Sequence, residues 1–451
     1  MKHQGLYRRD ALLALCAAVS PLAVVHAQAT DNYALQPWYV QMDALGMAPA
    51  LLVPDFAPGS KITTSPPLSD LTYWASLVLR LVVKYQQNPL RAARVLSYVQ
   101  VAMHDAWVWS YKLGGAVYSK AALAAVHQAA SLLLEQLYPN EVPGQFEAQR
   151  ALLTHPLNLS NAQAQWARRI GTKIGQILVE RSLRDGSQRV WSLKLRPAPF
   201  SGIWQPTYPL FAVNPLEGAA GQWTPWVARS AARYQPPIAF RPGSAEHSRE
   251  TLEVLQVSSQ LTDAQKRAAL DWNLDAGSVT PGGVWMQIAI DELTAHSAQQ
   301  RLSATVGTGI NLGFMLRVLA SLSVALHDAF IACWYIKLRD WSERPITAIQ
   351  RDLDPRFRPL LVTPGFPSYV SGHATVSAAA ATVLAYFLPQ NKDRYMRLAQ
   401  EAAASRLWGG IHFASDNAEG LRLGYSVGAD VIAQLSQEAT AGLPATMVPT
   451  P

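Results

Sequence analysis

Residues 362–382 read VTPGFPSYVSGHATVSAAAAT, and their centre is Ser371-Gly372-His373. The part before this centre is rich in proline and glycine, whereas residues 374–388 are small, apolar and nearly uncharged. This change predicts that the three central residues lie where a loop enters a buried helix. Free N–H groups at a helix start favour an anion. By itself, however, the stretch is more typical of a plain helix cap than of an anion cradle.

Apolar helical patterning continues on both sides of this stretch, and the alternation typical of strands is scarce. Helices are expected over residues 71–112, 120–138, 161–184, 262–275, 285–304, 310–342, 374–388, 391–410 and 418–437. Helical patterning also resumes from about Ser244, after a gap that begins near residue 195. The chain is therefore predicted to be all-α.

A six-residue echo divides the chain into two parts. Residues 101–106 read VAMHDA and residues 324–329 read VALHDA, each within a long apolar helix. The echo predicts two related helical-bundle halves, residues 28–243 and 244–451, with long Pro-rich loops. The two His-Asp pairs could be ligands, but buried pairs that hydrogen-bond between helices are the favoured interpretation.

The segment 197–242 contains nine prolines, with tryptophans at 204, 223 and 226. It is too long for an ordinary connection, so it is either a functional loop or a segment that wraps the body. Packing of its aromatic residues onto the body is favoured over a binding role.

Composition limits the classes of function. Of the 451 residues, 49% are hydrophobic and 15% are charged, which indicates a large buried core. The formal net charge is +7, and no Lys/Arg-rich run stands out, so no nucleic-acid partner is expected. A mildly basic surface favours anionic substrates.

Residues 1–27 have the features of an export signal. Arg8-Arg9 lies in a basic start, residues 11–25 form a short apolar core, and small residues near Ala27 offer a cleavage site. The arginine pair resembles a twin-arginine signal, and an ordinary Sec signal is nearly as well supported. The protein is therefore expected to be exported, to the periplasm or the medium, without a membrane span in the mature chain. Cys333 is then its single cysteine, which excludes an internal disulfide framework.

Three separate motifs carry the candidate chemistry. The first places Lys337 seven residues before Arg344, a spacing that predicts two cations on one helix face, with Pro345 ending that helix. The second is Ser371-Gly372-His373. The third runs from Ser405-Arg406 to His412 and Asp416, where an imidazole lies four positions, or one helical turn, before a carboxylate that can orient it.

Together these motifs fit a tetrahedral oxyanion. Lys337, Arg344 and Arg406 supply three positive charges, and the Ser371 hydroxyl and Gly372 amide supply two neutral donors. His412 would bond to the central atom, held by Asp416, and His373 would move protons. Taken singly, the Lys–Arg pair is more typical of a solvated helix face, the Ser-Gly-His stretch of a plain cap, and the Arg-His-Asp run of an ion-paired helix surface. All three in one exported chain are hard to explain as surface chemistry.

The pattern K-x6-R-P, S-G-H and S-R-x3-G-x-H-x3-D resembles the signature that joins type 2 phosphatidic acid phosphatases, bacterial acid phosphatases and vanadium-dependent haloperoxidases. One departure is Val370, where many members have proline before S-G-H. Chain length favours the haloperoxidases, and three further positions are similar to theirs, chloroperoxidases above all. The resemblance implies that Asp275 orients Arg406, and that Trp334 and Phe366 line a halide pocket; core packing is the alternative for these two aromatic residues.

The resemblance to haloperoxidases implies a vanadate cofactor, hydrogen peroxide and a halide as substrates, and a small organic acceptor for the hypohalous acid or its equivalent. The residues that would hold vanadate are Lys337, Arg344, Ser371, Gly372, Arg406 and His412, the last bonded to the metal. Lys337 would also polarise the bound peroxide, and His373 would accept a proton. A homodimer is left open.

Two other functions remain open on the same residues. An acid phosphatase would use His412 as the nucleophile, forming a phosphohistidine, and His373 to protonate the leaving group. A periplasmic phosphate-binding protein would need the cations but would have no need for both histidines and Asp416. Replacing His373 by alanine separates the last case, since a pure binder should keep its affinity.

Overall fold

The computed structural model describes residues 36–41, 43–46, 68–114, 119–192, 195–197, 201–227, 230–302 and 312–441. The expected export signal, residues 1–27, lies outside these ranges. The α-helices are α3 (Leu68–Lys84), α4 (Pro89–Gly114), α5 (Ser119–Leu137), α6 (Gln145–Thr154), α7 (Asn161–Arg184), α8 (Ala245–Ser259), α9 (Asp263–Asp271), α10 (Thr280–Leu302), α11 (Leu312–Asp340), α12 (Pro345–Asp352), α13 (Gly372–Phe387), α14 (Lys392–Trp408) and α15 (Ala414–Ala441). Short 3₁₀ turns are η2 (Asp43–Leu45), η4 (His155–Leu157), η6 (Ala220–Gln222), η7 (Ala231–Arg233) and η8 (Pro389–Asn391). The predicted all-α class is confirmed.

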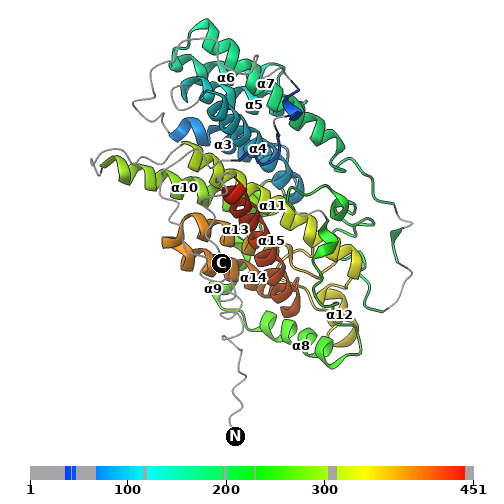
Figure 1. The fold of residues 1–451 in the computed structure, drawn as a ribbon. Coiled ribbons are helices and arrows are strands. Elements are labelled where there is room, and N and C mark those ends of the chain that lie inside the picture. Colours follow the sequence, from blue (N-terminus) through cyan, green and yellow to red (C-terminus); the bar gives the residue numbers. More distant parts are fainter. Residues whose placement is uncertain are drawn as a thin grey trace.

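The helices form two bundles that meet along α4 and α11. In the first bundle α4, α5 and α7 pack on one another, and in the second α11, α13 and α15 do the same. Figure 1 shows α5, α6 and α7 at one end, α4 and α11 in the middle, and α13, α14 and α15 beyond them. The two copies of the sequence echo lie on these central helices, residues 101–106 on α4 and 324–329 on α11.

The aspartates of the echo, Asp105 and Asp328, each bind the backbone of a loop and, among the residues that the structure describes, do not bond to another helix. The buried carboxylate of Asp105 on α4 accepts the backbone N–H groups of residues 38–40, at 2.7–2.9 Å. The buried Asp328 on α11 accepts those of Trp226 and Val227, at 2.8 and 2.9 Å. The expected bonds between helices are therefore replaced by bonds to loop amides, which would otherwise lack partners.

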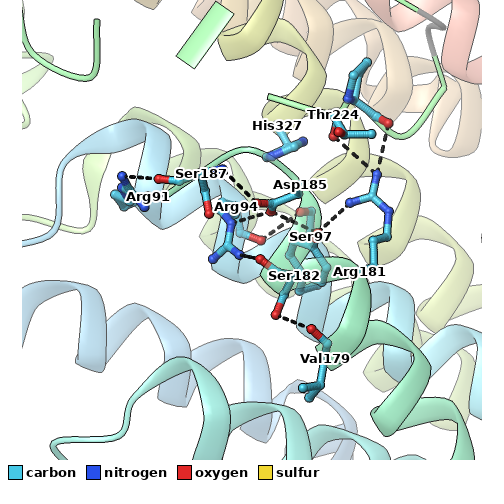
Figure 2. Close-up of polar contacts among 12 residues, drawn as sticks. Arg91, Arg94, Ser97, Val179, Arg181, Ser182, Asp185, Ser187, Thr224 and His327 are labelled. Carbon is cyan, nitrogen blue, oxygen red and sulfur yellow. Dashed lines mark hydrogen bonds and ion pairs between the residues drawn. The ribbon is translucent and has the colours of Figure 1, made fainter. Parts of the chain in front are cut away.

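Buried polar contacts fasten the Pro-rich segment to the first bundle. Arg94 on α4 pairs with Asp185, which follows α7, at 2.6 Å, and the backbone carbonyl of Asp185 accepts the amide of Thr224 at 2.7 Å. Arg181 donates to the carbonyl of Thr224 at 3.3 Å (Figure 2) and to that of Pro225 at 3.0 Å. The guanidinium of Arg181 also lies 3.7 Å from the ring centre of Trp226. These contacts hold the segment between the two bundles, where it reaches α11.

The tryptophans of the Pro-rich segment behave as the packing interpretation predicts. Trp204 and Trp223 are 1% and 3% exposed. Gly221 lies so close to α11 that an added Cβ would be 2.5 Å from the Cα of Tyr335. A side chain at this position would therefore push the segment away from α11.

Helix ends differ from the sequence predictions where a turn residue intervenes. The predicted helix 71–112 is two helices, because Gln86 adopts φ +46° and the side chain of Asn88 caps α4 by accepting the amides of Leu90 and Arg91. Helix α9 ends at Asp271 rather than at 275, and α6 and α12 were not predicted.

Helix α11 is the central element of the second bundle. Among the described residues it is the one helix long and apolar enough to span a bilayer, but 89% of its most apolar window is buried inside the protein. Such burial on all sides is typical of a core helix.

Three glycines on α15 allow α13 to approach closely. Gly420, Gly424 and Gly428 are four residues apart and face the backbone of α13. An added Cβ at Gly424 would overlap the carbonyl oxygen of Thr375. This close contact places the start of α13 beside the start of α15, where the candidate site lies.

Candidate active site

Ser371 and Gly372 lie at the start of α13, as predicted. Ser371 is the N-cap, and its hydroxyl oxygen accepts the amide of Ala374 at 3.4 Å. Its own amide donates to the backbone carbonyl of Asp416 at 2.9 Å. Because the oxygen accepts, the hydroxyl proton remains able to donate to an anion, so capping and anion binding are compatible. Both residues are buried.

Lys337 and Arg344 reach the site from two different helices, which corrects the predicted arrangement. Lys337 lies in the last turn of α11, which ends at Asp340, whereas Arg344 is the N-cap of α12. Pro345 begins α12 instead of ending a helix, because proline fits the first helical position. Trp341, with φ +49°, turns the chain between the two helices. The cations are therefore brought together by a turn, not by two helical turns.

Both cations are fully buried and tied to backbone carbonyls. The Lys337 ammonium donates to the carbonyls of Pro367 and Ser368, at 2.9 and 2.7 Å. Arg344 donates from Nε to the carbonyl of Phe366 at 2.9 Å and from one terminal nitrogen to that of Ile411 at 2.7 Å. These bonds fix both side chains without neutralising their charge.

His412 lies between Arg344 and Asp416. Its Nε2 is 3.0 Å from the same terminal nitrogen of Arg344, and its Nδ1 is 2.9 Å from Oδ2 of Asp416. Since a guanidinium can only donate, Nε2 is the accepting nitrogen and Nδ1 carries the proton toward the carboxylate. The Nε2 lone pair therefore faces the cations.

Ser368 is a site residue that the sequence reasoning missed. Its hydroxyl donates to Oδ2 of Asp416 at 2.5 Å and lies 3.4 Å from Nδ1 of His412. The residue is fully buried. Ser368 lies in the turn-rich run before Ser371, where a serine is common. Its position three residues before Ser371 was therefore the one sequence signal for its role.

Arg406 reaches the site from α14, but the expected partner is not in contact with it. Arg406 donates to the carbonyl of Ala269 at 3.0 Å and to the Ser405 hydroxyl at 2.9 Å. Asp275 is exposed and accepts a bond from Asn273, and within the described residues it forms no ion pair with Arg406 within 4.0 Å. Its charge raises the pKa of Arg406 only at longer range. Orientation by Asp275 is therefore corrected to orientation by α9 and Ser405.

His373 follows the cradle on the first turn of α13. Among the described residues its Nε2 is buried without a hydrogen-bond partner. Burial, and then the charge of Arg406, holds its pKa well below the ordinary value, although backbone groups at Trp272 and Asn273 oppose the shift. The lowered pKa favours the neutral imidazole, and a bound anion beside Arg406 would offset part of this shift and make Nε2 a better proton acceptor.

Burial, and repulsion between like charges, shift the pKa values of the charged residues in the site. Burial lowers the pKa of Lys337 to about 7, and those of Arg344 and Arg406 to about 9. The pKa of His412 is held well below its ordinary value, first by burial and then by the positive charges around it. Burial raises the pKa of Asp416, the carboxylate that faces these groups. The two arginines, together with the charged form of Lys337, thus outnumber the single carboxylate beside them, and a bound anion would favour that charged form.

This donor set fits an oxyanion. One terminal nitrogen of Arg344 has no hydrogen-bond partner in the described part of the chain. The same ranges contain no group of three or more His, Cys, Asp or Glu side chains that could hold a metal cation. An oxyanion such as vanadate or phosphate would supply acceptors to the unpartnered donors and balance the buried positive charge.

Trp334 and Phe366 lie together beside the oxyanion donors. Their ring centres are 5.0 Å apart, and the Lys337 ammonium lies 5.7 and 5.1 Å from the two ring centres. Trp334 is 2% exposed, and Phe366 is partly buried. The structure therefore places the two predicted pocket residues next to each other and to the site.

Comparisons with known proteins agree with this geometry. A family model described as the VCPO second helical-bundle domain matches residues 317–397 and 393–440. No curated protein sequence matches the chain significantly. The family model covers most of the second bundle, including each of the three motifs.

Similar solved structures extend the likeness to the whole fold. One, described as the first bacterial vanadium-dependent iodoperoxidase, has a TM-score of 0.64 at 23% identity, over 83% of this chain and 98% of that chain. A holo-type bacterial vanadium-dependent chloroperoxidase has a TM-score of 0.57 at 14% identity, over 85% and 99%. An apo-type structure with the same description has a TM-score of 0.55 at 14% identity, over 86% and 98%. The resemblance to vanadium haloperoxidases inferred from the motifs is confirmed, and the fold is shared.

Proposed function

We propose that this protein is a vanadate-dependent haloperoxidase, which uses hydrogen peroxide to oxidise a halide for halogenation of a small organic acceptor. The observation that carries the proposal is the set of buried cations around Nε2 of His412, next to the Trp334–Phe366 pair. The fold it shares with vanadium iodo- and chloroperoxidases supports the same function.

The residues that would hold vanadate are Lys337, Arg344, Ser371, Gly372, Arg406 and His412. Five of them offer N–H or O–H donors to its oxygens, and His412 offers the lone pair of Nε2 to the metal. When bound, vanadate supplies Lewis-acid activation of hydrogen peroxide without changing its own oxidation state.

Three side chains of the protein would supply the rest of the chemistry. Asp416 keeps the proton of His412 on Nδ1, so Nε2 stays available. His373, neutral and with an unpartnered Nε2, can take the proton that hydrogen peroxide must lose. Lys337 is fixed by two carbonyls, and a nearby anion favours its charged form, which can polarise an oxygen atom.

The aromatic pair supports the peroxidase over a phosphatase. A phosphatase would need the same cations, His412 as nucleophile and His373 as acid, so those residues serve both reactions. Trp334 and Phe366 add a pair of aromatic rings beside Lys337, which hydrolysis of a phosphate ester does not require. A halide ion, held by a cation and aromatic edges, gives this pair a role.

Halogenation of monochlorodimedone tests the proposal. Purified protein receives hydrogen peroxide with bromide or chloride, before and after addition of orthovanadate. We expect halogenation that depends on vanadate and is lost in His373→Ala. If no halogenation occurs with vanadate, and the protein hydrolyses p-nitrophenyl phosphate in a reaction that vanadate inhibits, the phosphatase would be established instead.

We further propose that the protein is exported after cleavage near Ala27, by the twin-arginine or the Sec route. N-terminal sequencing of protein from the periplasm or medium tests this. Replacing Arg8-Arg9 by two lysines separates the routes, since it should stop twin-arginine export and leave Sec export intact.

A further inference from the structure

The indole of Trp334 is held at its polar edge by the Pro-rich segment. Its Nε1–H donates to the carbonyl of Leu216 at 2.8 Å. Its opposite edge approaches the cradle, where Cζ3 lies 3.6 Å from the position that a Cβ on Gly372 would take. Because the N–H is engaged by Leu216, the ring presents its carbon edges toward Phe366 and Gly372. The carbonyl of Leu216 therefore sets the orientation of the ring.

The same peptide segment also holds the second aromatic residue. The amide of Leu216 donates to the carbonyl of Gly365 at 2.9 Å. Gly365 precedes Phe366, whose own carbonyl accepts Nε of Arg344. Leu216 thus connects both sides of the aromatic pocket through backbone bonds that depend on where its backbone lies, not on its side chain.

The position of Leu216 is fixed by the next residue, Glu217. Arg91, in the first turn of α4, binds both carboxylate oxygens of Glu217, at 2.7 and 2.9 Å, and Asn88 donates to one of them at 2.9 Å. Arg91 also donates to the carbonyl of Ser187 at 2.8 Å, a bond visible in Figure 2. Glu217 adopts φ +47°, so these contacts hold a backbone conformation that non-glycine residues rarely adopt.

We propose that Arg91 and Glu217 are positioning residues for the aromatic pocket. The ion pair holds the Leu216 peptide, the peptide holds the indole of Trp334 and the Gly365–Phe366 backbone, and the pocket then takes a halide. A residue of the first bundle thereby sets the halide affinity of a site in the second. The predicted effect on halide affinity rests on the proposed haloperoxidase function. The predicted effect on the position of the Trp334 indole rests on geometry alone.

An ordinary exposed ion pair would not have this effect. Exposed pairs contribute little to stability, and breaking one leaves distant side chains unmoved. The Arg91–Glu217 pair differs because it is bidentate, its side chains are only 30% and 16% exposed, and it lies one residue from the bond that orients Trp334. The Lys84–Glu141 pair offers a control, since it joins α3 to the α5–α6 connection within the first bundle.

The structural arm of the test observes Trp334 directly. Purified protein is labelled with ¹⁵N-tryptophan, and the Trp334 indole signal is assigned from the Trp334→Phe spectrum. In Glu217→Ala and in Arg91→Met we expect the Trp334 indole proton to move upfield and exchange faster with solvent. Glu141→Ala should leave it unchanged. An unmoved signal in both pair variants would overturn the proposal, and Arg91→Met remains informative if Glu217→Ala does not fold.

The kinetic arm separates binding of halide from binding of the oxyanion. We expect each pair variant to raise the KM for bromide about tenfold, since small displacements at a site are costly. The Kd for orthovanadate should change by a smaller factor, because Arg406 and His412 are held by Ala269 and Asp416 and not by this segment. The double variant should be no worse than either single one. A bromide KM like that of Glu141→Ala in both pair variants would contradict the proposal. If the wild-type protein oxidises no halide, the proposed function fails, while the indole signal still decides the positioning role.

Discussion

The Nδ1 atom of His412 lies 2.9 Å from Oδ2 of Asp416, although the two residues do not share a helix. His412 precedes α15, and Asp416 lies in its first turn. The same oxygen accepts the Ser368 hydroxyl at 2.5 Å and the amide of Phe413 at 3.1 Å. Three donors from two segments therefore fix one carboxylate, and through it the imidazole that faces the cations.

Asp416→Asn should weaken binding of orthovanadate about 10- to 100-fold, the usual effect of losing the partner that orients a metal-binding histidine. An amide in place of the carboxylate cannot accept all three bonds at one oxygen, so the imidazole loses its fixed tautomer. Isothermal titration calorimetry measures the effect. Asp430→Asn, on the same helix but paired with Arg233, is the matched control and should bind as the wild type does.

His412→Ala should abolish vanadate binding, because it removes the Nε2 atom that lies 3.0 Å from Arg344 and whose ring Asp416 orients. The cations remain, so weak binding of phosphate should persist where vanadate binding is lost. Calorimetry with both anions separates these cases. His155→Ala, an exposed histidine in η4, serves as the control. Tight vanadate binding by His412→Ala would falsify the assignment of the metal ligand.

Gly424→Ala should destabilise the protein by about 1–3 kcal/mol, because the added methyl overlaps α13. The same displacement should weaken vanadate binding, since α13 begins at the cradle. Urea denaturation and calorimetry measure the two effects. Gly282→Ala on α10 is the control: its nearest neighbour would lie 3.7 Å from the new Cβ, so stability should be unchanged or higher.

The carboxyl of Glu250 should make stability depend on pH. Burial raises its pKa from 4.5 to about 7, although the amide and hydroxyl of Ser415 donate to it at 2.7 and 2.8 Å. A carboxyl with a higher pKa in the folded chain binds its proton more tightly there. The free energy of unfolding should therefore fall as pH rises from 4.5 to about 7.

Glu250→Gln removes this titration. Relative to the wild type, the variant should be more stable at pH 8 than it is at pH 5, as measured by urea denaturation at both values. Glu246→Gln, on the same helix with a side chain 46% exposed, should show no such change. Equal pH dependence in the wild type and Glu250→Gln would refute the role of this carboxyl.

The sequence by itself determined the helical class and most helix positions, and it named the candidate residues of the oxyanion site. Long apolar runs such as residues 374–388 can only be buried as helices in so uncharged a chain, and the three motifs name specific donors whose chemistry suits an oxyanion. The echo at residues 101–106 and 324–329 lies on α4 and α11, the two helices along which the bundles meet.

Only the tertiary structure decided how these residues meet. The turn at Trp341 brings Lys337 and Arg344 together, and Arg406 is held by the carbonyl of Ala269, not by Asp275. Backbone carbonyls, such as that of Leu216 at Trp334, leave no trace in side-chain patterns, because every residue carries one. Which carbonyl meets which donor depends on the path of the loops, and that path is set by contacts between segments more than a hundred residues apart.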